Sequence, residues 1–150
     1  MPQSYTCLHY HLIFATQDRV PHLTPDLRRR VLDYVGGIIK NERGVLIAAG
    51  GAQDHIHLLA GLHPEKAVAD MLRVIKANAS KWVHENFPAQ PAFAWQAGYG
   101  AFSVSRSNLD EVRRYIGGQE EHHRRISFEE EFRQFLDRHG IAYDPRYLWA

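Results

Sequence analysis

Cysteine is nearly absent from this chain of 150 residues, which contains Cys7 and no other cysteine. One thiol excludes an internal disulfide and a metal site built from several cysteines, and such low usage is typical of a reducing compartment. Long apolar runs are missing as well, since no stretch approaches the roughly 20 residues of a membrane helix. No basic segment followed by an apolar one opens the chain. We therefore expect a cytoplasmic protein without a signal peptide or membrane contact.

An excess of charge of either sign is missing too, because the net charge is only +1 at pH 7. The charges are unevenly placed: from position 128 onward acids outnumber bases, and the rest of the chain is mildly basic. Basic clusters can hold phosphate groups, although solvated helix faces explain each cluster equally well. The side chains that we single out as candidate phosphate contacts are Arg28, Lys76, Lys81, Arg106, Arg113 and Arg114.

Internal repeats and low-complexity segments are absent, and the hydrophobic content of 45% is that of an ordinary globular protein. The length suffices for one real core, so we expect one domain over 1–150. Its core is predicted at about 8–125, followed by a C-terminal helix and tail at 126–150. The tail aromatics Tyr143, Tyr147 and Trp149 are expected to pack on the domain or on a partner chain.

Strands are predicted where aromatic and β-branched residues gather between turn signals. Gly50 and Gly51 are expected to form a turn or bulge between two of them, which would pair as a hairpin. The predicted strands are 8–15, 45–49, 55–62 and 95–105.

Helices are predicted where apolar residues recur every three or four positions. Thr24, followed by proline, gives the first helix a capped start. Ser107 can cap the third helix, with Asp110 in the place of a capping-box acid. The predicted helices are 24–41, 64–87, one from Ser107 onward and one at about 127–139.

The resulting order β-α-β-β-α-β, followed by helices, predicts an α+β protein with a ferredoxin-like fold. This fold is a four-stranded antiparallel sheet with two helices on one face, here with added C-terminal helices. Its first and third strands are central neighbours, so His11 and His57 are expected to lie close together. The other face of the sheet is expected to be free for a ligand or a second subunit.

His55 and His57 stand two apart in an apolar run, so in a strand both side chains point to one face. Two imidazoles on a rigid strand supply half of a metal site, which needs at least one further ligand. The pattern is weak by itself, because the chain has 10 histidines and a second such pair at His9 and His11.

Tyr115 and Gln119 are four residues apart in the third predicted helix and therefore share a face, near the edge of its apolar side. A surface tyrosine in a polar helix is about as common as the functional alternative, a nucleophile beside a metal-binding amide oxygen. Gly117 and Gly118 lie between them and cost a helix interior roughly 1–2 kcal/mol relative to alanine. If the helix breaks there, Tyr115 and Gln119 need not lie on the same face.

Four blocks of sequence, taken together, are far more specific than any of these pairs. They are YHLIF at 10–14, DHIHLL at 54–59, WQAGYGAFSVS at 95–105 and VRRYIGGQEEHH at 112–123. In this order the chain resembles the single-tyrosine HUH transposases of bacterial insertion sequences, including relatives associated with repetitive extragenic palindromes. The resemblance covers most of 8–125.

The resemblance implies an enzyme that cuts and rejoins single-stranded DNA. His55, His57 and Gln119 would hold Mg²⁺ or Mn²⁺, and Tyr115 would attack the scissile phosphate to give a 5′-phosphotyrosine link. Members of the family are homodimers, in which the tyrosine helix of one subunit can complete the other site. The implied substrate carries hairpins near the ends of a mobile element, and the basic residues named above become candidate DNA contacts. Such a protein would act at the nucleoid, in the bacterial cytoplasm.

Other interpretations stay open. His122 and His123 compete for the position of third ligand, and a set of two histidines plus oxygen could also hold Zn²⁺. Tyr99 is a rival nucleophile, whereas Ser103 and Ser105 are expected to contact phosphate or to pack. A non-cutting module that binds single-stranded DNA or RNA hairpins would use the same fold. A metal-binding regulator without nucleic acid is a third reading.

Overall fold

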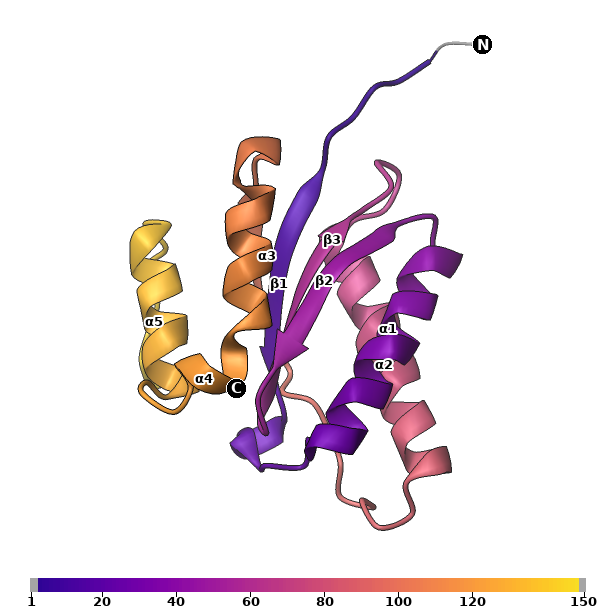
Figure 1. Ribbon diagram of the computed structural model, residues 1–150, viewed down its shortest axis with the longest axis vertical. Helices are drawn as coiled ribbons and strands as arrows, with labels where there is room; N and C mark the ends of the chain where they lie inside the picture. Colours follow the sequence, from indigo (N-terminus) through magenta and orange to yellow (C-terminus); the bar gives the residue numbers. More distant parts are fainter. Residues whose placement is uncertain (1–2, 149–150) are drawn as a thin grey trace.

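A four-stranded antiparallel sheet forms the centre of the computed structural model, which describes residues 3–148 (Figure 1). Its strands are β1 (His9–Ala15), β2 (Val45–Gly51), β3 (His55–Gly61) and β4 (Gly100–Val104). They lie in the order β2-β3-β1-β4, so the first and third strands are the central neighbours. The predicted ferredoxin-like α+β fold is confirmed.

Helices α1 (Pro25–Asn41) and α2 (Val68–Asn86) cover one face of the sheet (Figure 1). Thr24 caps α1 as predicted, because its hydroxyl accepts a hydrogen bond from the backbone N–H of Leu27 at 3.4 Å. The side chains between these helices and the sheet form the main core, including Leu12, Phe14, Ile56 and Leu58. Because side chains alternate along a strand, the intervening residues of β1 and β3 face the opposite side.

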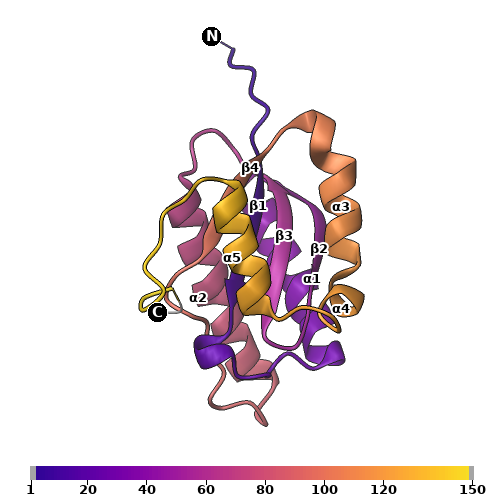
Figure 2. The ribbon, with the colours of Figure 1, turned by 90° about the vertical axis from the view of Figure 1, so that its left-hand side faces the viewer.

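That opposite side is covered by the chain itself, so the prediction of a free sheet face is wrong. Helices α3 (Leu109–Gly117), α4 (Gln119–His122) and α5 (Phe128–Arg138) lie over it, and Figure 2 shows α5 crossing in front of the strands. The apolar stripe of α5 packs on residues of β1 and β4 in a second, smaller core. This core consists of Ile13, Ala15, Phe102, Phe128, Phe132 and Leu136.

Two elements begin later than predicted, and hydrogen bonds explain both. Helix α2 starts at Val68 instead of position 64, because the Lys66 N–H turns back to the His63 carbonyl at 2.9 Å. Strand β4 starts at Gly100 instead of position 95. The carbonyl groups of 96–98 accept hydrogen bonds from the Lys76 ammonium, at 2.5–3.4 Å. These carbonyl groups therefore have hydrogen-bond donors without pairing to a neighbouring strand.

The predicted cap of α3 is wrong. A short 3₁₀ turn, Arg106–Asn108, precedes the helix, and the Ser107 hydroxyl lies 3.0 Å from the hydroxyl of Ser105 instead of capping it. Helix α5 does follow its predicted cap, since Ser127 accepts from the N–H of Glu130 at 3.2 Å. In the tail, Tyr143 packs on the second core, whereas Trp149 lies outside the described residues.

Gly50 belongs to β2, not to the predicted turn, because α3 approaches the sheet very closely there. A Cβ atom at Gly50 would lie 2.4 Å from the backbone oxygen of Ile116. No side chain larger than hydrogen fits between them, so glycine lets the helix backbone rest directly on the strand. This contact brings residue 115, the neighbour of Ile116, over the histidine-bearing face.

Within residues 3–148, no helix is long and apolar enough to cross a membrane.

Candidate active site

Strand β3 directs His55 and His57 to the face that α5 covers, and both side chains are fully buried. Each ring is held by an outer partner. The Nδ1–H of His55 donates to the Asp54 carboxylate at 2.8 Å, and the Nδ1 of His57 lies 2.7 Å from the Nε2 of His11. The backbone carbonyl of Asp54 in turn accepts from the N–H of Thr16 at 2.9 Å. Outer contacts of this kind orient imidazoles for metal binding and leave Nε2 pointing inward.

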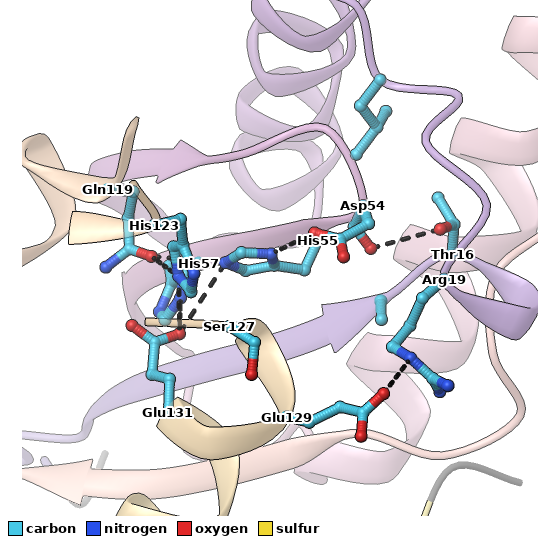
Figure 3. Close-up of polar contacts among 12 residues, drawn as sticks. Thr16, Arg19, Asp54, His55, His57, Gln119, His123, Ser127, Glu129 and Glu131 are labelled. Carbon is cyan, nitrogen blue, oxygen red and sulfur yellow. Dashed lines mark hydrogen bonds and ion pairs between the residues drawn. The ribbon is translucent and has the colours of Figure 1, made fainter. Parts of the chain in front are cut away.

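A third histidine and a carboxylate meet these rings from the C-terminal segment (Figure 3). The Nδ1–H of His123 donates to the Ile126 carbonyl at 2.8 Å, so its Nε2 also points inward. Glu131, which is 1% exposed, places Oε1 2.9 Å from the Nε2 of His57 and 3.2 Å from that of His123. The same oxygen lies 3.7 Å from the Nε2 of His55.

The chemistry of these donors fits a divalent cation. Ligand atoms of His55, His57, His123 and Glu131 all lie within 4.8 Å of one another. Imidazole nitrogens with a carboxylate oxygen are a common donor set for transition metals and Mn²⁺. Gln119 is also buried here, with its Oε1 2.9 Å from the Nε2 of His123 and 3.3 Å from that of His55. An amide oxygen therefore borders the same centre.

The structure brings Tyr115 to this cluster within one chain. Its hydroxyl donates a hydrogen bond to Oε2 of Glu131 and lies 3.4 Å from the Nε2 of His122. Its ring centre is 6.0 Å from that of His57. Helix α3 ends between Tyr115 and Gln119, so these residues do not share one continuous helix as predicted. Gln119 still stays close, with its Nε2 3.4 Å from the backbone oxygen of Tyr115.

Burial and hydrogen bonding together decide which of these groups carry charge. It lowers the pKa of His57 from 6.5 to about 4 and that of His11 to about 3. Burial also opposes ionisation of Glu131, but hydrogen bonds from His123, His57 and Tyr115 outweigh it and hold its pKa below the usual range. Burial, and then the nearby Glu131 carboxylate, raise the pKa of Tyr115 above its ordinary value. At neutral pH His57 and His11 are therefore neutral, Glu131 is a carboxylate and Tyr115 is a protonated phenol.

These shifts predict acid sensitivity of the metal-free protein. Between about pH 6.5 and pH 4 the unfolded chain binds protons that buried His57 does not, so stability is complete above that window and falls within it. One pKa unit is worth about 1.4 kcal/mol, so acidification to about pH 5 should cost on the order of 2 kcal/mol through His57. We expect the melting temperature, measured with a chelator, to drop by several degrees.

The matched variant for this prediction is His11→Gln, because a buried amide cannot be protonated in this range. The pKa of His11 is also lowered by burial, so its removal should flatten the loss of melting temperature between about pH 7.5 and pH 5. An equal melting temperature at both pH values in the unmodified protein would contradict the assignment of neutral buried histidines.

The basic residues predicted to contact phosphate lie in different environments. Lys76 holds the carbonyl groups before β4, and Arg28 pairs with Glu120 and donates to the Leu23 carbonyl. Both are therefore engaged in structural contacts. The others are exposed at the surface, on α2 or on α3 and the turn before it: Lys81, Arg106, Arg113 and Arg114.

The residues considered as alternatives to Tyr115 and Gln119 lie in different parts of the structure. Tyr99 lies before β4, with its ring 5.6 Å from the Lys76 ammonium. Ser103 is exposed on β4 and Ser105 follows that strand. His123, named as a rival third ligand, does lie in the cluster.

Glu131 was not predicted as a site residue, although the sequence contains a signal for it. Three acids follow one another at 129–131, and Glu131 lies three positions after Phe128 and four before Phe135, on the apolar side of α5. An acid on the buried stripe of an amphipathic helix needs partners, because burying an unpaired carboxylate is costly. The histidines and Tyr115 supply them.

Comparisons with known proteins show which family the chain is similar to. The family model described as "Transposase IS200 like" matches residues 4–119. The ISDra2 transposase TnpA of Deinococcus radiodurans is 23% identical over 117 residues, covering 75% of this chain and 84% of the relative.

Two solved structures share the fold. One, from Deinococcus radiodurans R1 and assigned to the transposases, has 26% identity and a TM-score of 0.64 over 79% of this chain and 96% of its own. A REP-associated tyrosine transposase bound to a REP hairpin has 12% identity and a TM-score of 0.52, over 77% of this chain and 68% of its own. Because the family model spans most of the chain, including His55, His57, Tyr115 and Gln119, the protein belongs to the IS200-like transposase family.

Proposed function

We propose that the protein is a metal-dependent transposase that cleaves and rejoins single-stranded DNA through a 5′-phosphotyrosine intermediate. The observation that carries this proposal is the position of the Tyr115 hydroxyl, which touches Glu131 of the histidine cluster. A phenol beside a group of inward-pointing imidazole nitrogens places a nucleophile next to a cation site. In this proposal His55, His57 and Gln119 hold Mg²⁺ or Mn²⁺, and the Nε2 of His123 faces the same centre.

The residues of this chain would act by binding and orienting. Tyr115 oxygen forms a bond to phosphorus while the bond from phosphorus to the 3′ oxygen breaks, and the proton from the phenol ends on that 3′ oxygen. The link conserves the energy of the phosphodiester, so a second 3′-hydroxyl can reverse the step. The cation, when bound, offsets the charge that develops on the phosphate. Asp54 and His11 keep the ligand rings oriented.

The proposed substrate is single-stranded DNA with folded hairpin ends. The structural neighbour bound to a REP hairpin supports a hairpin ligand for this fold. Exposed arginines on and before α3, the helix that carries Tyr115, are suitable phosphate contacts: Arg106, Arg113 and Arg114. We further propose a homodimer in the bacterial cytoplasm, although Tyr115 reaches the histidines of its own chain without a partner.

A non-cutting module that binds hairpins is the second candidate, and one observation favours it. The side chains of His55 and His57 are buried beneath α5, which itself carries the buried Glu131, so a phosphate cannot touch them unless that helix shifts. A protein that only binds hairpins would have no need of such a shift.

The experiment that tests the proposal uses labelled single strands from the flanks of the coding region, incubated with Mn²⁺ or with a chelator. We expect a denaturant-resistant protein–DNA adduct with Mn²⁺ and none with the chelator. Mass spectrometry of the adduct should place the nucleotide on the peptide that contains Tyr115. An adduct on Tyr99 would overturn the assignment of the nucleophile. Retarded DNA without any adduct would favour the binding module.

A further inference from the structure

The two carboxylate oxygens of Glu131 contact different groups. Oε1 faces the inward nitrogens of His57 and His123, at 2.9 and 3.2 Å. Oε2 accepts from the Tyr115 hydroxyl and lies 3.1 Å from the Nε2 of His122. The carboxylate therefore stands between the cation site and the phenol, with one oxygen on each side.

Glu131 also lies outside the part of the chain that defines the family. The family model ends at position 119, whereas α5 begins at Phe128. The matched segment already contains His55, His57, Tyr115 and Gln119. The C-terminal helix thus adds an acidic side chain to a site in which His123 also lies beyond the family segment, whereas His55, His57, Tyr115 and Gln119 lie within it.

We propose that Glu131 is a positioning residue that joins the cation site to the nucleophile, one oxygen facing the bound cation and the other holding the Tyr115 hydroxyl in the same chain. The proposal rests on the proposed function and deepens it. It assigns a role to the C-terminal helix and explains how Tyr115 is held at the histidines of its own subunit.

Packing of α5 does not account for Glu131. The helix already docks through Phe128, Phe132 and Leu136, and Glu129 pairs with Arg19 at 2.8 Å. A buried carboxylate adds a desolvation cost to this docking, and an apolar residue would avoid that cost. The contacts that compensate it are all with groups of the proposed site, which is the pattern expected of a functional residue.

Positioning follows from the geometry of the phenol. Tyr115 is half-buried on α3, and its hydroxyl would otherwise rely on weaker contacts such as that with His122 at 3.4 Å. A charged acceptor forms a stronger hydrogen bond than a neutral one and restricts the direction of the hydroxyl more tightly. Holding a nucleophile in one orientation raises the rate of attack, because less orientational entropy is lost on reaching the transition state.

The decisive measurement is Mn²⁺ binding by calorimetry in the absence of DNA. Glu131→Gln keeps the size of the side chain and removes its charge, and the matched control Glu130→Gln makes the same change at an exposed position on the same helix. We expect Glu131→Gln to weaken Mn²⁺ binding by about tenfold or more, in line with the loss of an oxygen ligand or its neighbour. Glu130→Gln should bind as the unmodified protein does.

Two results would overturn the proposal. Unchanged Mn²⁺ affinity in Glu131→Gln would mean that Glu131 only stabilises the docking of α5. Tighter Mn²⁺ binding would show that its carboxylate competes with the cation. If Glu131→Gln fails to fold, as judged by circular dichroism, Glu131→Asp replaces it, since the shorter side chain keeps the charge and cannot reach both sides. We then expect Mn²⁺ binding to be retained in part while the Tyr115 adduct is lost; equal retention of both would overturn the proposal.

The contact with Tyr115 is tested without metal or DNA, by a double-mutant cycle on the melting temperature. Tyr115→Phe should lower the melting temperature in the unmodified background and leave it nearly unchanged in Glu131→Gln. Additive shifts would overturn the positioning role. Absence of any DNA adduct in the unmodified protein, together with these metal and melting results, would reject the proposed DNA chemistry and leave the role of Glu131 standing.

Discussion

Tyr115→Phe is expected to abolish the covalent protein–DNA adduct and to lower strand cleavage by about a thousandfold or more, a loss typical of removing a catalytic nucleophile. The substitution deletes the hydroxyl oxygen that would bond to phosphorus. The phenylalanine ring keeps the edge contacts with His57 and Phe135, whose ring centres lie 6.0 and 5.8 Å away. The loss should therefore be chemical and leave the fold intact. Denaturing gels with labelled single strands and Mn²⁺ measure both products.

Tyr99→Phe is the control for this prediction. Tyr99 lies in the third family-like block, at 95–105, is 40% exposed and lies near the Lys76 ammonium, so removal of its hydroxyl should leave adduct formation close to normal. An adduct that survives in Tyr115→Phe and disappears in Tyr99→Phe would reverse the assignment.

The second large effect is expected from the histidines that we propose as metal ligands. His55→Ala should weaken Mn²⁺ binding by about a hundredfold or more and lower cleavage with it, since an inward-pointing nitrogen is lost from the centre. Asp54→Asn should weaken Mn²⁺ binding by about 10–100-fold, because the amide can no longer orient the His55 ring as a charged acceptor. Calorimetric titration with Mn²⁺ gives both affinities, and the adduct assay gives the cleavage.

The other His-x-His pair provides the control for these variants. His9 lies half-buried at the start of β1, with its Nδ1 3.5 Å from the sulfur of Cys7. His9→Ala should bind Mn²⁺ like the unmodified protein. If His55→Ala binds Mn²⁺ as tightly as His9→Ala does, the proposed centre is not the metal site.

Local sequence signals were sufficient for the parts of the site that lie within one element. Alternation along a strand placed His55 and His57 on one face, and the start signal of Thr24 and proline placed α1 correctly. The order of strands and helices was enough for the ferredoxin-like fold. The glycine pair at 117–118 correctly indicated a weak point, and α3 ends there.

The predicted start of the fourth strand was wrong because a side chain distant in sequence forms the hydrogen bonds of the backbone there. Lys76, on α2, takes up the carbonyl groups of 96–98 and so removes them from the predicted fourth strand. Gly50 read as a turn residue, although it is a strand residue against which α3 rests. Neither contact leaves a trace in the local pattern, because propensities describe neighbours along the chain.

The sequence by itself determined the fold class, the pair of ligand-type histidines and the helix with Tyr115, since each depends on spacing within a short segment. The fold class predicted that His11 lies near His57, and the structure confirms it with a contact of 2.7 Å across 46 residues. Only the tertiary structure showed that Glu131 reaches His57, across 74 residues. The first contact requires the register that pairs Ile13 with His57, and the second requires α5 to dock on the sheet face opposite α1 and α2. Strand register and helix docking are set by side chains packing across the whole domain, which no local segment contains.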